Sequence, residues 1–226
     1  MSKREVCIGH IAELFLCESY ENPGEYEAGD PDVFRRLKEK AEEEEKRGGY
    51  PAALQNYEKA LALNPADVSL RFGILRCDYH LHRLDEMHEE TLRLYPYLCT
   101  RQELAGFYRF LGCWYLETYQ PETAERLYRY SLLFAPSGQA EQDIRYLETA
   151  LKRPTPEYSV AELQERLQKE QIPLRASNVT MALLVKAAEE AEKKQLWQQE
   201  LDCYRMVYDL TQDEEIGRKI RSLSKK

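Results

Sequence analysis

The sequence predicts an all-α protein built from helical hairpins that pack side by side in a stack. Apolar residues recur three and four positions apart along almost the whole chain, which is the period of a helix with one packed face. Alternating runs rich in β-branched residues are absent, so we expect no strand anywhere. Residues that start and end helices recur at the spacing of short helices joined by tight turns.

Composition and charge exclude one class of partner. The chain has 226 residues, of which 43% are hydrophobic and 32% charged, and its net charge is −8. Lysine and arginine are dispersed among aspartate and glutamate, whereas nucleic-acid binding requires clustered cations that face the phosphates. We therefore expect no nucleic-acid partner.

The cysteines and the N-terminal stretch indicate where the protein functions. Six cysteines are scattered without a C-x-x-C pair, which is typical of reduced thiols in a cytoplasmic protein. His10 and Glu13 interrupt the first apolar stretch before it reaches the length of a signal peptide or a membrane span. We therefore expect neither export nor membrane association.

Residues 1–30 are predicted to form an N-terminal helix followed by an acidic linker. The helix is expected over residues 3–18, with apolar residues toward one side, and a turn is expected at residues 22–24. Two roles for this helix stay open. It caps the stack, or it lies in the groove of the stack as a surrogate ligand.

Capping residues mark several helix starts. Thr100 is followed three residues later by Glu103, and Ser159 by Glu162, which is the spacing of a capping box. Pro51 suits the first turn of a helix, because its missing N–H would have no intrahelical partner there. Each of these signals predicts the start of a helix.

The strongest hairpin pattern lies in residues 37–65, LKEKAEEEEKRGGYPAALQNYEKALALNP. It resembles a tetratricopeptide repeat (TPR). Its small residues would permit two helices to approach closely, while tyrosine and leucine fill the remaining space. The positions that carry the resemblance are Leu37, Ala41, Gly48, Tyr50, Ala53, Tyr57, Ala60, Leu61 and Pro65.

Further copies of this pattern divide the chain. Residues 108–136 repeat the offsets well and residues 68–96 repeat them poorly, so residues 31–136 are predicted to hold three hairpins. Residues 179–226 are predicted to hold a weaker hairpin, in which Glu200 replaces a small residue, and a capping helix at residues 214–223.

Residues 137–178 carry no TPR signature and are interpreted as a divergent helical connector. Two helices are expected there, over residues 140–151 and 160–170. Two arrangements stay open for this segment. It continues the stack as one more hairpin, or it forms a hinge between two parts.

The residues suggestive of metal chemistry are Cys77 and His80 with His82 and His88, and Cys7 with His10 near the start of the chain. Zinc requires about four converging ligands, and His82 does not share the helix face of Cys77 and His80. We expect no metal site and no cofactor. Nucleotide-binding and nucleophile motifs are also absent from the sequence, so an enzyme with a cavity between helices is only a remote alternative.

The TPR resemblance implies a fold and a function. It implies a right-handed superhelical stack of antiparallel hairpins, an α-solenoid, whose first helices line a concave groove that accepts a peptide or helix from a partner protein. We therefore expect a non-catalytic protein-interaction module; the alternative is a self-associating scaffold, a homo-oligomer. The groove residues implied by the family positions are Lys38, Glu42, Glu45, Gly73, Arg76, Arg109, Cys113 and Leu116.

The charges at these positions suggest a ligand. Lys38, Arg76 and Arg109 place cations in an otherwise acidic protein, so we predict an acidic or amphipathic segment as ligand. The alternative is that these cations only balance carboxylates within the stack. The TPR proteins that bind the C-terminal carboxylates of heat-shock chaperones use Asn where this chain has Glu42 and Cys113, which argues against that ligand.

Overall fold

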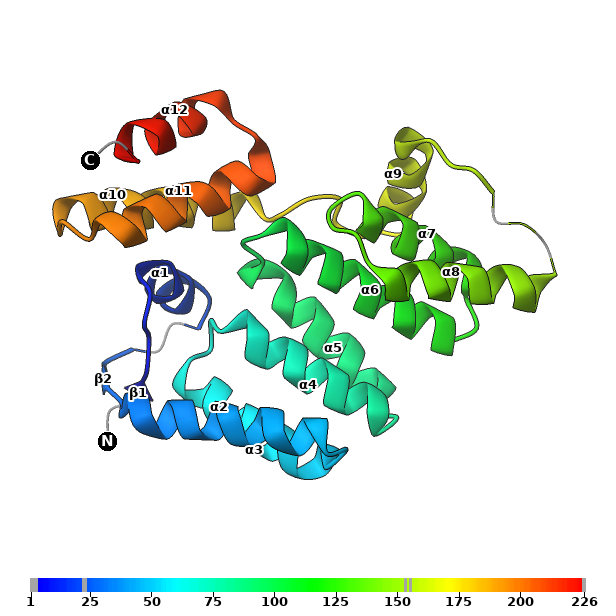
Figure 1. The fold of residues 1–226 in the computed structure, drawn as a ribbon, viewed down its shortest axis with the longest axis horizontal. Helices are drawn as coiled ribbons and strands as arrows, with labels where there is room; N and C mark the ends of the chain where they lie inside the picture. Colours follow the sequence, from blue (N-terminus) through cyan, green and yellow to red (C-terminus); the bar gives the residue numbers. More distant parts are fainter. Residues whose placement is uncertain (1–3, 22–23, 153, 155, 225–226) are drawn as a thin grey trace.

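Helices dominate the computed structural model, which describes residues 4–21, 24–152, 154 and 156–224 (Figure 1). The prediction of an all-α protein is confirmed at this level. No helix in the described ranges is long and apolar enough to cross a bilayer. The helices are α1 (Ile11–Tyr20), α2 (Pro31–Lys46), α3 (Tyr50–Leu63), α4 (Val68–His80), α5 (Leu84–Leu94), the 3₁₀ turn η1 (Tyr95–Tyr97), α6 (Arg101–Glu117), α7 (Pro121–Leu132), α8 (Gly138–Leu151), α9 (Val160–Lys169), α10 (Asn178–Lys193), α11 (Trp197–Thr211) and α12 (Glu214–Leu223).

Helices that are neighbours in the chain pack against each other. Packing is most extensive between α2 and α3, between α6 and α7 and between α10 and α11, and α3 and α5 also pack against the helices that follow them. In Figure 1, the pairs α2–α3, α4–α5 and α6–α7 follow one another across the molecule. Residues 31–136 therefore form six helices in a row, each in contact with the next.

The predicted capping signals begin their helices as expected. Both capping boxes are present, with Thr100 paired to Glu103 at the start of α6 and Ser159 paired to Glu162 at the start of α9. The turn between α2 and α3 contains Gly48 at a φ of +78°, a left-handed conformation that glycine adopts without steric penalty.

The expectation that the chain needs no strand is wrong near its beginning. Strand β1 (Arg4–Val6) pairs in parallel with β2 (Tyr26–Ala28). The helix predicted over residues 3–18 therefore starts only at Ile11, where the Nδ1 of His10 caps it by accepting a hydrogen bond from the backbone N–H of Ala12 at 3.1 Å. Residue 3 and residues 22 and 23 of the predicted turn lie outside the described residues.

Small residues allow the first hairpin to pack closely, as the pattern predicted. Ala41 in α2 and Ala53 and Ala60 in α3 have no exposed surface. They form one buried cluster with Tyr57 and with apolar residues of α4, among them Leu70. Close packing of this kind stabilises the hairpin through many short-range contacts.

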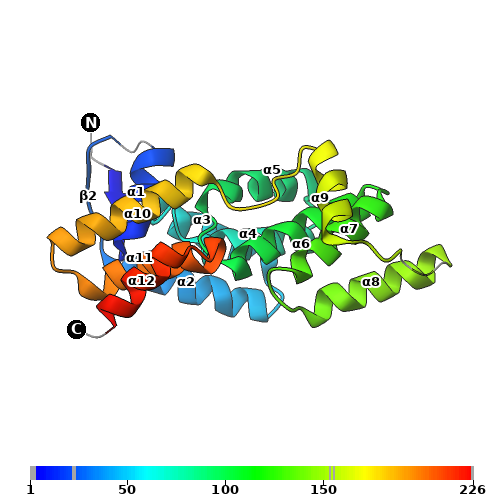
Figure 2. The same ribbon diagram turned by 90° about the horizontal axis from the view of Figure 1, so that it is seen from above.

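The C-terminal helices return to the beginning of the chain. Helices α8 and α9 both pack on α7, whereas α10 packs on α1, so the two chain ends lie at one end of the molecule in both ribbon views (Figures 1 and 2). The backbone N–H of Ile11 donates to Gln199 Oε1 at 2.8 Å, and the hydroxyls of Tyr20 and Thr180 lie 2.9 Å apart. Helix α12 then covers α11.

Candidate functional site

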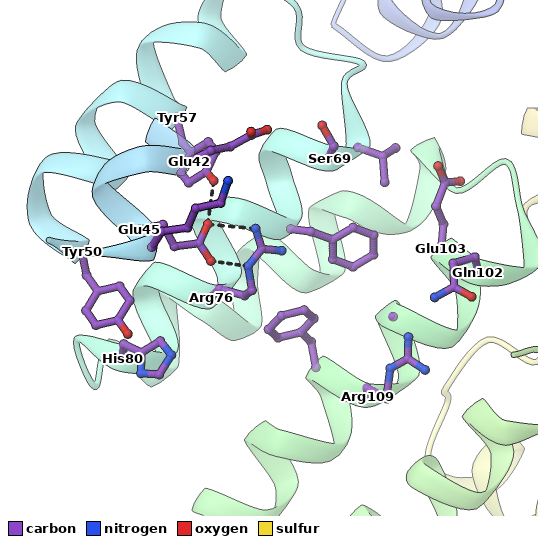
Figure 3. Close-up of a pocket in the computed structure, with 15 residues that line it drawn as sticks. Glu42, Glu45, Tyr50, Tyr57, Ser69, Arg76, His80, Gln102, Glu103 and Arg109 are labelled. Carbon is purple, nitrogen blue, oxygen red and sulfur yellow. Dashed lines mark hydrogen bonds and ion pairs between the residues drawn. The ribbon is translucent and has the colours of Figure 1, made fainter. Parts of the chain in front are cut away.

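A hollow of about 650 Å³ opens between α2, α4 and α6, with Tyr50 and Tyr57 of α3 also in its lining (Figure 3). We call it the central hollow. Residues on one face of each helix line it, because positions three, four or seven apart share a helix face. Its charged, polar and aromatic lining includes Glu42, Glu45, Lys46, Tyr50, Tyr57, Phe72, Arg76, His80, Gln102, Glu103, Arg109 and Phe110.

Two phenylalanines form an apolar platform in the central hollow. The rings of Phe72 and Phe110 are stacked, with their centroids 5.8 Å apart and an angle of 24° between their planes. Gly106 makes room for this arrangement, because a β-carbon at that position would lie 2.6 Å from Cζ of Phe72. The platform can pack against an apolar or planar group of a ligand.

The charge of Arg76 is compensated within the hollow. Its Nη2 donates to Glu45 Oε2 at 2.9 Å, its Nε donates to the other carboxylate oxygen, and the hydroxyl of Tyr57 donates to Oε2 at 2.6 Å (Figure 3). Burial opposes ionisation of Glu45, but these hydrogen bonds outweigh it, so the pKa of Glu45 is lowered. Arg76 and Glu45 therefore act as an ion pair between α4 and α2.

Lys38 is also compensated, but outside the central hollow. Its Nζ lies 2.8 Å from Asp67 Oδ2, and the Lys38 side chain lines a neighbouring hollow. Asp67 itself caps α4 by accepting hydrogen bonds from the backbone N–H groups of Ser69 and Leu70. Lys38 thus links α2 to the start of α4.

Arg109 differs from the other two predicted cations. This half-buried side chain lines the central hollow and forms no hydrogen bond or ion pair with any residue that the structure describes; its Nη1 is buried without a partner. Burial lowers the pKa of Arg109. A cation withdrawn from water without a counter-ion is electrostatically unfavourable, so the position is suited to an anionic group of a ligand.

Three predicted groove residues lie elsewhere. Gly73 faces the ring of Tyr57 at the contact between α3 and α4. Cys113 accepts a hydrogen bond from the Tyr128 hydroxyl at 3.6 Å, and burial raises the pKa of the Cys113 thiol to about 11. Leu116 packs against the apolar cluster that contains Tyr128. The central hollow thus brings together Glu42, Glu45, Arg76 and Arg109, and not these three or Lys38.

Sequence reasoning missed the aromatic platform, although a signal for it exists. Phe72 precedes Arg76 by one helical turn, and Phe110 directly follows Arg109. The four-residue spacing places Phe72 on the face of Arg76. Gln102 could likewise be found, because it lies two helical turns before Arg109 in α6.

The residues of the suggested metal pattern pack separately. His80 stacks on Tyr50, with 4.2 Å between ring centroids, and His88 stacks on Trp114 at 3.8 Å. Cys77 is fully buried, and burial raises the pKa of its thiol to about 12. In the described part of the chain, no group of three or more His, Cys, Asp or Glu side chains could hold a metal ion.

No protein-family model matches this sequence, and comparison with curated proteins gives no match either. The resemblance to TPR proteins therefore depends on the residue pattern and on the packing of neighbouring helices. Any function has to be argued from the chemistry of the central hollow.

Proposed function

We propose that this chain is a non-catalytic protein-interaction module that binds a peptide or helix of a partner protein in the central hollow. The single observation that carries the proposal is Arg109, a half-buried cation without a described partner beside an aromatic platform. Apolar contact combined with one well-placed charge is typical of sites that recognise peptides.

The proposed architecture is a TPR-like α-solenoid, a right-handed superhelical stack of antiparallel hairpins. Three observations support it: neighbouring helices are in contact, the alanines of the first hairpin are fully buried, and Gly48 lies in the first turn. In such a stack the first helix of each hairpin lines the inner surface. Most of the residues that line the central hollow come from α2, α4 and α6, with Tyr50 and Tyr57 from α3, and this supports the proposal.

The proposed ligand is acidic or amphipathic, and Arg109 is its principal ionic contact. Because Arg76 is paired with Glu45 and Lys38 with Asp67, neither offers an uncompensated charge. Arg109 retains its hydrogen-bonding capacity for a ligand carboxylate, with which a guanidinium forms strong charge-assisted hydrogen bonds.

Charge reversal tests this function. Immobilised wild-type protein would capture partners from a native lysate, and Arg109→Glu is expected to capture the same partners at least about tenfold less. Arg93→Glu is the matched control, because Arg93 lies on the exposed surface of α5, paired only with Glu89 among described residues. Circular dichroism verifies that both variants stay folded. Undiminished capture by a folded Arg109→Glu variant would contradict the proposal.

The proposed location is the cytoplasm, without a cofactor. All six cysteines lie within the described residues, and all are free thiols. Burial raises the pKa of several of them, including Cys99 and Cys203, which keeps them protonated and unreactive. Free thiols of this kind are typical of a reducing compartment.

A self-associating scaffold is the second candidate function. Tyr119 and Tyr146 are 94% and 64% exposed, and exposed aromatic rings are common in protein interfaces. Size exclusion coupled to light scattering distinguishes the two functions. A stable dimer or larger assembly at micromolar concentration would support the scaffold, and a monomer would leave the peptide-binding module as the better proposal.

A further inference from the structure

A second hollow, of about 310 Å³, adjoins the central hollow toward the N-terminal helix. We call it the N-terminal hollow. Val68, Ser69 and Glu103 line both hollows, so the two are neighbours on one surface. Both volumes fall within the range of about 300–1,000 Å³ that is common for ligand pockets.

The walls of the N-terminal hollow come from both ends of the chain. Leu16 of α1 and Met206 of α11 line it together with residues at the start of α4. The packing of α10 and α11 on α1 brings these distant segments together. A ligand that extends from the central hollow would therefore reach the N-terminal helix and the C-terminal hairpin.

The ionised groups of the N-terminal hollow already have partners. Lys38 pairs with Asp67 at 2.8 Å. Glu13 Oε2 accepts a hydrogen bond from Asn64 Nδ2 at 3.1 Å, and Glu103 Oε2 accepts hydrogen bonds from the backbone N–H groups that precede α6. A charged ligand group would have to break one of these interactions, whereas an apolar group would not.

Apart from these groups, the lining of the N-terminal hollow combines apolar residues with His10, Ser69, Tyr97 and Cys99. The hydroxyls of Ser69 and Tyr97 and the thiol of Cys99 are hydrogen-bonded, whereas Nε2 of His10 is buried without a partner among the described residues. Ala12, Leu16, Ala66, Val68 and Met206 contribute hydrocarbon or thioether groups to its lining. An uncharged apolar side chain can bury its surface against these groups without breaking any of the interactions named above. The two hollows therefore differ in the chemistry that they favour.

We infer that the partner contributes one continuous acidic-apolar segment that spans both hollows. It places a carboxylate at Arg109 and, at a fixed spacing, an uncharged apolar side chain in the N-terminal hollow between α1 and α11. The inference rests on the proposed function and defines its ligand more closely. Arg109 has no described partner, so the carboxylate is assigned to the central hollow. The charges near Leu16 and Met206 are already paired, so the apolar side chain is assigned to the N-terminal hollow.

Peptide selection tests the inference. A display library of random peptides, each of about fifteen residues so that one can extend over both hollows, is selected on the full chain. Enriched peptides are expected to contain Asp or Glu and a large apolar residue at one recurring spacing. One selected peptide, labelled with a fluorophore, then serves as the probe for affinity measurements by anisotropy.

A substitution where the two hollows meet tests whether one ligand occupies both. Ser69 is exposed in the first turn of α4 and lines both hollows, so Ser69→Trp is expected to obstruct passage between them. Ser69→Ala is the control, because both variants lose the hydrogen bond from the Ser69 hydroxyl to Asp67. The probe is expected to bind Ser69→Trp about tenfold more weakly, and Ser69→Ala within about twofold of wild type.

A change in the peptide completes the test. Replacing its apolar residue by Ser should weaken binding to wild type about tenfold but weaken binding to Ser69→Trp much less, since the two changes remove the same contact. Enriched peptides with a required acidic residue, no recurring apolar position and equal affinity for Ser69→Trp would overturn this inference alone. Failure to enrich any peptide, or peptides indifferent to Arg109→Glu, would overturn the proposed function as well.

Discussion

The ring of Tyr57 in α3 lies directly against Gly73 in α4, where a β-carbon would be only 2.5 Å from the ring's Cζ. Tyr128 in α7 lies against Gly112 in α6 in the same way, with a corresponding distance of 2.7 Å to Cε1. Both tyrosines are almost completely buried. Each glycine therefore provides the space that a buried tyrosine ring occupies between two helices.

Gly73→Ala is expected to destabilise the protein by about 1–3 kcal/mol, because the new methyl group overlaps a buried ring. Alanine favours a helix over glycine by about 1 kcal/mol, so the effect of overpacking has to exceed this gain. Urea denaturation measures the change. Gly138→Ala is the control, since no atom lies within 4 Å of a β-carbon there, and it is expected to leave stability unchanged or slightly higher.

Ala53→Leu and Ala124→Leu are each expected to lower the free energy of unfolding by about 1–3 kcal/mol. Both alanines have no exposed surface, so a larger side chain must displace a neighbouring helix. Glu44→Ala in α2 should change stability by no more than about 0.5 kcal/mol, as is usual for side chains that remain in contact with water. A neutral Ala53→Leu would contradict the close contact between α2 and α3.

Local signals explain how much of the fold could be predicted from the sequence. The capping box of Thr100 and Glu103 acts within one helical turn, and it begins α6 as expected. The helix predicted over residues 214–223 has the bounds of α12, because Asp213 caps its start. The TPR-like pattern of residues 37–65 also placed Ala41 and Ala53 correctly in the core of the first hairpin.

Interactions between distant segments explain what could not be predicted. The pairing of β1 with β2 involves three residues on each strand, too few to produce a recognisable alternating pattern. The hydrogen bond from Ile11 to Gln199 joins residues 188 positions apart. In the candidate site, Arg76 is compensated by Glu45, 31 residues away. The sequence therefore could not show that, of the predicted groove cations Lys38, Arg76 and Arg109, Arg109 is the one without a described partner.

Asp78→Asn is expected to remove a pH dependence of stability. Burial raises the pKa of Asp78 from its ordinary 3.8 to about 6, although Arg83 lies 3.4 Å away and favours ionisation. Between these pH values the folded protein holds a proton that the unfolded chain has lost, so the free energy of unfolding falls as pH rises. Above about pH 6, ionisation of Asp78 lowers the free energy of unfolding by about 2–3 kcal/mol.

The measurement compares wild type with Asp78→Asn in urea denaturation from pH 4 to pH 8. The amide cannot ionise, so the variant should become more stable relative to wild type as pH rises, and the difference should level off above about pH 6. A difference that does not change with pH would show that Asp78 does not titrate in this range. Asp143→Asn in α8 is a suitable control, because Asp143 is only partly buried, whereas Asp78 is almost completely buried.

Arg76→Gln is expected to affect mainly stability, and Arg109→Gln is expected to affect mainly binding. Arg76→Gln removes the partly exposed ion pair with Glu45 and should lower stability by about 1 kcal/mol. Arg109→Gln removes a half-buried cation that has no described partner, so stability should not fall.

Binding of an acidic ligand should depend more on Arg109 than on Arg76. Arg109→Gln is expected to weaken binding of a selected acidic peptide about tenfold, and Arg76→Gln by less than about threefold, because Arg76 is paired with Glu45 whereas the half-buried Arg109 has no described partner. Added salt should weaken wild-type binding more than binding to Arg109→Gln, since screening acts on the charge that the variant lacks. If Arg76→Gln instead abolishes binding at unchanged stability, the Arg76–Glu45 pair opens to contact the ligand, and Arg109 is not its principal ionic contact.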